Sequence, residues 1–145
     1  MARLIFDLDG TLVHSLPALA RAGNALLAEL GRPPVTERTY RGYVGRGMAA
    51  QVTDLLAGSG GLPEPGLAPH LERFLEIYNA DPITGCTLFP GAADALAVLA
   101  ASHRIGVSTQ KPEAAAWHLL EAMGLAHAIE ALTGGDTLDV LKPDP

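Results

Sequence analysis

The spacing of apolar residues changes twice along the chain, which divides it into segments of different structure. Residues 2–6 form a short apolar run that predicts a buried strand, and Gly10 is the expected turn after it. Apolar residues then recur at helical spacing over residues 15–85, with no strand pattern between them. From Phe89 onward strand and helix patterns alternate, which is typical of a parallel sheet with right-handed crossovers.

The helical segment predicts four amphipathic helices, and so a small bundle inserted after the first strand. Ser15 is the expected N-cap of the first helix, which runs to Leu30. Thr36 is the expected cap of a short second helix. A Gly/Pro-rich loop over residues 58–66 separates the third helix from the fourth.

The alternating segment predicts two helices, over residues 92–101 and 112–123. It also predicts two strands, over residues 104–109 and 129–133. The sheet domain is therefore expected to be discontinuous, with residues 1–14 joined to residues 86–145. Residues 15–85 form a helical cap domain between these two parts. We predict an α/β fold with a parallel-sheet, Rossmann-like core and an inserted helical-bundle cap.

Composition narrows the class of protein. Apolar residues make up 48% of the chain and charged residues 18%, as in ordinary globular proteins. The formal net charge of -6 argues against nucleic acid or an anionic membrane as the main partner. The single cysteine excludes an internal disulfide, and no run approaches the roughly 18 apolar residues of a membrane span. We therefore expect a cytoplasmic protein.

Two aspartates, Asp7 and Asp9, follow the first predicted strand. Open α/β sheets bind their ligands at this carboxyl edge. Like charges two residues apart repel each other unless a cation lies between them or one of them is protonated. Hard carboxylate oxygens suit Mg²⁺, so we expect Asp7 and Asp9 to form a magnesium site. The alternative is a strand followed by a solvated acidic turn.

Four strings of residues resemble the haloacid dehalogenase-like hydrolases. Residues 7–12 read Asp-x-Asp-Gly-Thr-Leu, the first motif of that family. Residues 105–112, 134–136 and 142–145 match, in order and spacing, the second and third motifs of its phosphoglycolate phosphatase branch. The fourth, acidic motif of the family would follow Pro145 and is not in this sequence. The C-terminal part of the core is therefore expected to be absent.

The resemblance implies a role for each aspartate. Asp7 would be the nucleophile that forms an aspartyl-phosphate, and Asp9 the general acid for the leaving group and then the base for water. Mg²⁺ would bind the Asp7 carboxylate, the main-chain carbonyl of Asp9 and an aspartate of the fourth motif.

Phosphate contacts are expected from the second and third motifs. Thr109 ends a predicted strand just before a helix, which places its hydroxyl beside a helix N-terminus, a site that favours anions. The resemblance implies that Thr109, Gln110 and Lys142 bind the phosphoryl group. Gln110 replaces the Asn usual in the branch, and His14 replaces an Asp at the entry to the cap. Lys111 is common in the branch, although a surface role for it is equally compatible with the sequence.

The cap is expected to choose the substrate. Arg46 lies between Gly45 and Gly47 in a string that resembles the cap loop of phosphoglycolate phosphatases, and glycines there would let the backbone approach a ligand. Arg46 and Gly47 are our candidate substrate contacts. Arg46 either reaches the substrate carboxylate or points into solvent.

The leading hypothesis is a Mg²⁺-dependent phosphatase for a small phosphorylated acid such as 2-phosphoglycolate. Dehalogenases of the family need no second catalytic aspartate, so Asp9 argues against them. Phosphonatases use a cap lysine, and residues 15–85 contain none. A sugar-phosphate phosphatase or mutase stays open. So does an incomplete, inactive chain that self-associates through an exposed sheet edge at residues 4–6.

Overall fold

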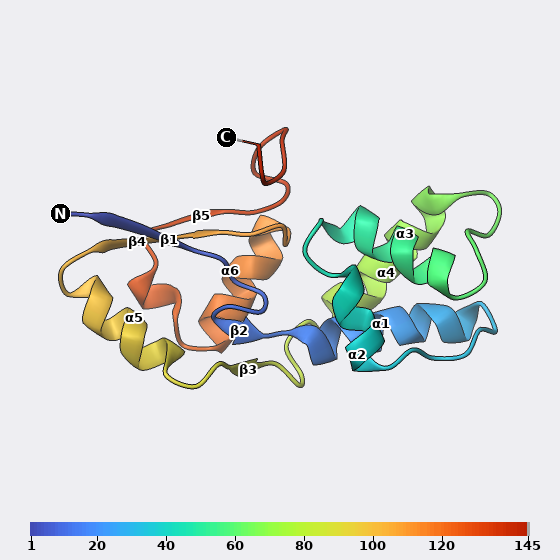
Figure 1. Ribbon diagram of the computed structural model, residues 1–145, viewed down its shortest axis with the longest axis horizontal. Helices are drawn as coiled ribbons and strands as arrows, with labels where there is room; N and C mark the ends of the chain where they lie inside the picture. Colours follow the sequence, from blue (N-terminus) through green and yellow to red (C-terminus); the bar gives the residue numbers. More distant parts are fainter. Residues whose placement is uncertain (145) are drawn as a thin grey trace. The chain divides into compact units, whose positions relative to one another are not determined.

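The protein is described by a computed structural model over residues 1–144; Pro145, the last residue of the third-motif string, lies outside the described residues. The chain divides into two compact units (Figure 1). One, the sheet unit, contains Met1–Ser15 and the chain from Cys86 onward. The other, the helical unit, is Leu16–Gly85. No helix in the described part of the chain is long and apolar enough to cross a membrane.

The sheet unit contains a three-stranded parallel sheet with strand order β1-β4-β5. Its strands are β1 (Arg3–Phe6), β4 (Arg104–Ser108) and β5 (Ala131–Thr133). Ile5 of β1 lies opposite Gly106 of β4, and Gly106 lies opposite Ala131 of β5. The predicted α/β fold with a parallel sheet is confirmed. β1 and β5 are the two edge strands of the described sheet, and self-association through β1 stays a prediction.

One face of this sheet carries the core of the unit. Ile105 and Val107 of β4 are 2% and 3% exposed. The helices α5 (Ala92–Ala100) and α6 (Glu113–Ala122) cover that face (Figure 1). Both helices add buried leucines, among them Leu96 and Leu119. Burial of such side chains stabilises the unit by about 1.5–3 kcal/mol for each one fully buried. The same packing fixes the carboxyl ends of the strands.

A small antiparallel ribbon in the sheet unit was not predicted. It pairs β2 (Val13–His14) with β3 (Thr87–Leu88), so that Val13 lies opposite Leu88. The amide of Phe89 extends the pairing by donating to the carbonyl of Leu12 at 3.1 Å. Two-residue strands are too short to show a period of two, so no pattern in the sequence indicates them.

The helical unit contains the four helices that the spacing predicts. They are α1 (Leu16–Glu29), α2 (Glu37–Tyr40), α3 (Met48–Gly58) and α4 (Leu67–Ala80). A 3₁₀ turn over Arg41–Tyr43 continues α2, and another, Ala126–Ala128, precedes β5 in the sheet unit. The predicted cap of α2 is confirmed, because the Thr36 hydroxyl accepts a hydrogen bond from the Thr39 amide at 3.2 Å.

Tyr40, the last residue of α2, is fully buried in the helical unit. Its hydroxyl accepts a hydrogen bond from Nε2 of Gln51 at 2.7 Å, and burial raises the pKa of that hydroxyl. The Tyr40 ring packs against Gly23 of α1, where a Cβ atom would lie 2.3 Å from Cε2. Gly23 is therefore a close-approach position, although a helix interior ordinarily favours alanine.

We expect Gly23→Ala to destabilise the helical unit by about 1–3 kcal/mol, the usual effect of an extra methyl group in a packed core. This overpacking outweighs the gain of up to about 1 kcal/mol from alanine's better helix propensity. Urea unfolding followed by circular dichroism measures the difference. Gly42→Ala is the matched control, because a Cβ there meets nothing within 4 Å. A Gly23→Ala variant as stable as the parent protein would contradict the packing described here.

Candidate active site

The polar residues expected to carry chemistry meet at the carboxyl edge of the sheet. Asp7 directly follows β1, Thr109 directly follows β4, and Gly134 directly follows β5. Because the three strands are parallel neighbours, their carboxyl ends lie at the same edge, where open α/β sheets bind ligands. The segment after Gly134 brings Lys142 to the same place.

Asp7 and Lys142 form an ion pair although 135 positions separate them in the sequence. The Lys142 ammonium donates to Oδ1 of Asp7 at 3.0 Å and to the carbonyl of Ser108 at 2.8 Å. Both side chains keep close to half of their surface exposed, at 46% for Asp7 and 41% for Lys142. The pair is therefore open to a ligand from solvent.

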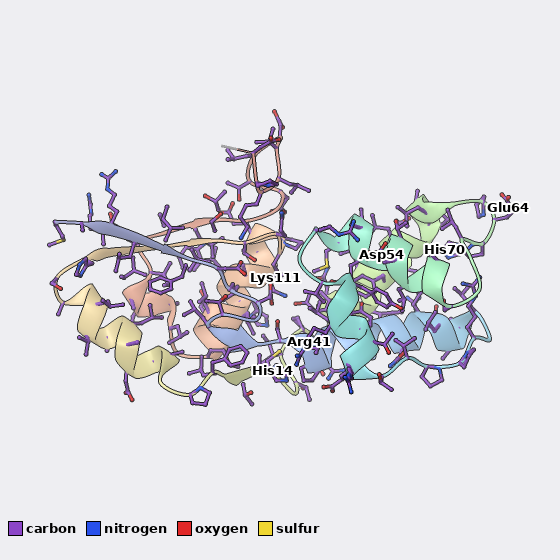
Figure 2. The ribbon with its side chains drawn as sticks, in the orientation of Figure 1. His14, Arg41, Asp54, Glu64, His70 and Lys111 are labelled. Carbon is purple, nitrogen blue, oxygen red and sulfur yellow. The ribbon has the colours of Figure 1, made fainter. Side chains whose placement is uncertain are left out.

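Asp9 has a second, more buried lysine as its partner. The ammonium of Lys111 lies 3.2 Å from Oδ1 of Asp9, and the two side chains are 1% and 15% exposed. The surface role that the sequence left open for Lys111 is therefore wrong. Ser15, expected as the N-cap of α1, donates its hydroxyl hydrogen bond to the same Oδ1 atom. Figure 2 labels Lys111 in the sheet unit, close to α6.

The turn between the two aspartates and β2 is held by its own backbone. The carbonyl of Leu8 accepts hydrogen bonds from the amides of Leu12 and Val13 at 3.0 and 3.1 Å. The Gly10 amide donates to the carbonyl of Val13 at 2.9 Å, with φ of Gly10 at +81°, a region that favours glycine. Because Leu8 is itself fully buried, the main chain on both sides of Asp9 is fixed.

Thr109 is buried at the end of β4, with 4% of its surface exposed. Its amide donates to the carbonyl of Thr133 at 2.9 Å, and its hydroxyl oxygen accepts from the Lys111 amide at 3.1 Å. Since that oxygen is already an acceptor here, the hydroxyl proton is the part of Thr109 that can be offered to an anion. A cavity of about 80 Å³ lies beside it, and its lining includes Gln110 and Lys142.

The start of α6 already has an anionic partner, which the sequence did not predict. The carboxylate of Asp136 accepts a hydrogen bond from the Glu113 amide at 2.7 Å, so a side chain occupies part of the expected anion site. Gly134 and Gly135 allow this contact, because a Cβ at Gly135 would lie 2.2 Å from the carbonyl oxygen of Gln110. The Gly-Gly-Asp string at residues 134–136 is the sequence feature from which this contact at the start of α6 could have been predicted.

Gln110 holds the third-motif lysine from the side. Its Nε2 atom donates to the main-chain carbonyl of Lys142 at 2.9 Å. The amide that replaces the usual Asn thus contacts the backbone of the residue that pairs with Asp7. The structure therefore brings four predicted residues together with Asp7, namely Asp9, Thr109, Gln110 and Lys142.

The donors at this edge fit a hard cation. Mg²⁺ in enzymes usually binds one or two carboxylates together with water and substrate phosphate. The half-exposed Asp7 carboxylate and the main-chain carbonyl of Asp9 are oxygen donors of this kind. Within residues 1–144, no group of three or more His, Cys, Asp or Glu side chains forms a ready-made metal site. Any further ligands would be water, substrate oxygen or groups beyond the described residues.

The remaining predicted residues, Arg46 and Gly47, belong to the helical unit. Gly45 and Gly47 have φ of +116° and +90°, so the turn around Arg46 depends on glycine. The Arg46 guanidinium donates to the carboxylate of Asp54, which Figure 2 labels on α3. The Arg46 side chain is still 67% exposed. It is therefore paired at the surface and accessible.

Comparison with known proteins points to one family. Residues 4–145 match the model of the family described as haloacid dehalogenase-like hydrolase. The chain is 45% identical to a phosphoglycolate phosphatase of Rhodospirillum rubrum over 148 residues, covering 98% of this chain and 61% of the relative. It is 41% identical to a phosphoglycolate phosphatase of Cereibacter sphaeroides, covering 100% of this chain and 67% of the relative.

A solved structure agrees with these relatives. The crystal structure of a predicted phosphoglycolate phosphatase from Haemophilus somnus superposes with a TM-score of 0.89 at 28% identity. The superposition covers 98% of the present chain and 65% of the Haemophilus somnus chain. The present chain thus spans less than two thirds of the length of that structure and of the Rhodospirillum relative.

Proposed function

The chain belongs to the haloacid dehalogenase-like hydrolases. We propose that it carries the catalytic residues of a Mg²⁺-dependent phosphatase whose substrate is 2-phosphoglycolate. The observation that carries the proposal is the pairing of Asp7 with Lys142 beside Thr109 at the carboxyl edge of the sheet. A nucleophile, a compact positive charge and a hydroxyl donor converge there, as transfer of a phosphoryl group requires. The identity to phosphoglycolate phosphatases supports the choice of substrate.

The proposed reaction has two steps. In the first, a carboxylate oxygen of Asp7 attacks phosphorus, so that an oxygen–phosphorus bond forms and the ester bond to the glycolate oxygen breaks. Asp9, protonated at this stage, gives its proton to that departing oxygen. In the second step, Asp9 takes a proton from water, which attacks the aspartyl-phosphate and releases inorganic phosphate and the Asp7 carboxylate.

Other groups at the site support the charge changes in these steps. Lys142 contacts Oδ1 of Asp7, so we assign the attack to Oδ2. The Lys142 ammonium and the Thr109 hydroxyl stabilise the negative charge of the transferring phosphoryl group. Mg²⁺, held by the Asp7 carboxylate and the Asp9 carbonyl, would supply the charge neutralisation that a dianionic phosphate needs beside a carboxylate.

The direct test is release of inorganic phosphate from 2-phosphoglycolate, compared with a panel of sugar phosphates under the same conditions. We expect kcat/KM to be highest for 2-phosphoglycolate. A sugar phosphate that is hydrolysed more efficiently would overturn the substrate assignment. A sugar phosphate that is isomerised without net phosphate release would identify a mutase.

Substrate choice is proposed to depend on Arg46. The exposed Arg46–Asp54 ion pair contributes little stability, about 0–1 kcal/mol, so Arg46 can exchange Asp54 for a substrate carboxylate. A hydrogen bond to a charged group contributes about 1.5–3 kcal/mol, so Arg46→Ala should lower kcat/KM for 2-phosphoglycolate roughly ten- to a hundredfold. Hydrolysis of p-nitrophenyl phosphate, which has no carboxylate, should change little.

Asp54→Asn is the matched control for this prediction. It breaks the same ion pair but keeps the guanidinium, so activity on 2-phosphoglycolate should be retained. Steady-state kinetics of both variants on both substrates gives the comparison. Equal losses on the two substrates after Arg46→Ala, or no loss on either, would place specificity elsewhere.

A further inference from the structure

Each of the two lysines of the chain pairs with one of the two strand-end aspartates. Lys142 lies 3.0 Å from Asp7, and Lys111 lies 3.2 Å from Asp9. The rest of the ten lysine and arginine residues are arginines, and none of their side-chain ion pairs involves these aspartates in the described residues. A lysine ammonium is a compact point charge on a flexible stem, so it can meet a single carboxylate oxygen, whereas the planar guanidinium of arginine favours bidentate contacts.

The burial of Lys111 needs a specific reason. Lysine is almost never fully buried unless it is paired, and removal of its charge from water costs several kcal/mol even after relaxation. Only 1% of the Lys111 side chain is exposed, compared with 41% for Lys142. A lysine at the surface would have contributed the same net charge without this cost. A burial this costly points to a function for the contact between Lys111 and Asp9.

The main chain around Lys111 is held rigidly. Its amide donates to the Thr109 hydroxyl oxygen at 3.1 Å, and its carbonyl accepts from the Gly135 amide at 2.8 Å. These bonds tie Lys111 to the end of β4 and to the loop after β5. The main chain that carries the Lys111 side chain is therefore held in place. A residue that positions another side chain needs such support.

Both contacts to the Asp9 carboxylate converge on one atom. The Lys111 ammonium and the Ser15 hydroxyl each meet Oδ1. Two partners on a single oxygen fix the torsion of the carboxylate, and so determine where its other oxygen, Oδ2, lies. A proton is transferred efficiently only if its donor is held within hydrogen-bond reach of the acceptor.

We infer that Lys111, assisted by Ser15, is a positioning residue that anchors Oδ1 of Asp9 so that Oδ2 is the oxygen that exchanges the proton with the leaving group. This inference rests on the proposed phosphatase function. Lys111 acts through Asp9 and not on the phosphoryl group, which distinguishes its role from that of Lys142.

The test compares a poor leaving group with a good one. The glycolate alkoxide of 2-phosphoglycolate needs a proton as it departs, whereas p-nitrophenolate does not. Lys111→Met should lower kcat/KM for 2-phosphoglycolate by about 10²-fold, the lower end of the usual contribution of general acid–base catalysis. It should lower kcat/KM for p-nitrophenyl phosphate far less. The ratio kcat/KM is used because it covers only the steps up to departure of the leaving group.

A double-mutant cycle with Asp9→Asn shows whether Lys111 acts through Asp9. In the Asp9→Asn background, Lys111→Met should cause little further loss, because the group that it positions can no longer give a proton. Arg104→Met is the matched control. It removes one positive charge and the exposed Arg104–Glu130 ion pair at the opposite end of the sheet, and kcat/KM should be unchanged.

Each remaining outcome decides the inference. Equal losses on the two substrates, or losses that multiply in the cycle, would overturn it. If Lys111→Met does not fold, Ser15→Ala removes the other Oδ1 contact and should give the same substrate pattern with a smaller loss; equal losses there would also overturn it. If the parent protein hydrolyses neither substrate, the proposed function is wrong. The same double-mutant cycle, measured as shifts of the unfolding midpoint, then tests the contact between Lys111 and Asp9. Shifts of the two single variants that simply add in the double variant would refute that contact.

Discussion

Asp7→Asn should abolish phosphate release from 2-phosphoglycolate. An amide is a far weaker nucleophile than a carboxylate, and the substitution also removes the anion that pairs with Lys142 at 3.0 Å. Loss of a catalytic nucleophile lowers kcat by roughly 10⁶-fold in well-studied hydrolases, so the activity should fall below detection. Phosphate release under saturating substrate, measured against a blank without enzyme, gives the size of the loss.

A second measurement on the same variant examines the covalent step itself. Acid quenching of the parent protein during turnover should trap a phosphate on the peptide that contains Asp7, and Asp7→Asn should show none. Asp94→Asn on the exposed surface of α5 is the matched control and should keep full activity. Near-normal turnover by Asp7→Asn would eliminate the aspartyl-phosphate mechanism.

Removal of divalent metal should have an effect of similar size. The Asp7 carboxylate and a dianionic phosphate repel each other, and Lys142 supplies only one positive charge between them. We therefore expect attack to require a hard dication, whose charge would offset this repulsion. Dialysis against a chelator should stop turnover of 2-phosphoglycolate, and added Mg²⁺ should restore it in a saturable manner.

The control for chelation is the fold of the protein. Circular dichroism of the chelated sample should match that of the untreated sample, because the strands and helices around the site are held by backbone pairing and apolar packing. Turnover that continues undiminished in chelator would refute the metal assignment. Recovery of activity without added metal after removal of the chelator would refute it as well.

Much of the fold was predictable because its signals are local. Helical spacing marks α1 through α4 in the sequence, and alternating strand and helix patterns predict the parallel sheet. The β2–β3 ribbon was missed because two-residue strands leave no period to detect. Its pairing depends on residues 13 and 88, far apart in the sequence, which meet only once the unit has folded.

The sequence could predict which residues form the candidate site, but it could not predict which side chains contact each other there. The motif strings identified Asp7, Asp9, Thr109 and Lys142, and the structure places them at one edge of the sheet. The burial of Lys111 could not be read from the sequence, because it depends on where the segment after β4 turns relative to Asp9. The same holds for Asp136, whose contact with α6 requires a tight approach of two glycines.

The unequal exposure of the two lysines has a practical consequence for chemical labelling. Of the two lysines in residues 1–144, a reagent directed at primary amines reaches the Lys142 ammonium, whereas Lys111 is shielded. Modification of the amines can therefore be followed almost one site at a time. Protection of Lys142 by a bound phosphate would report occupancy of the site directly, without any need for turnover.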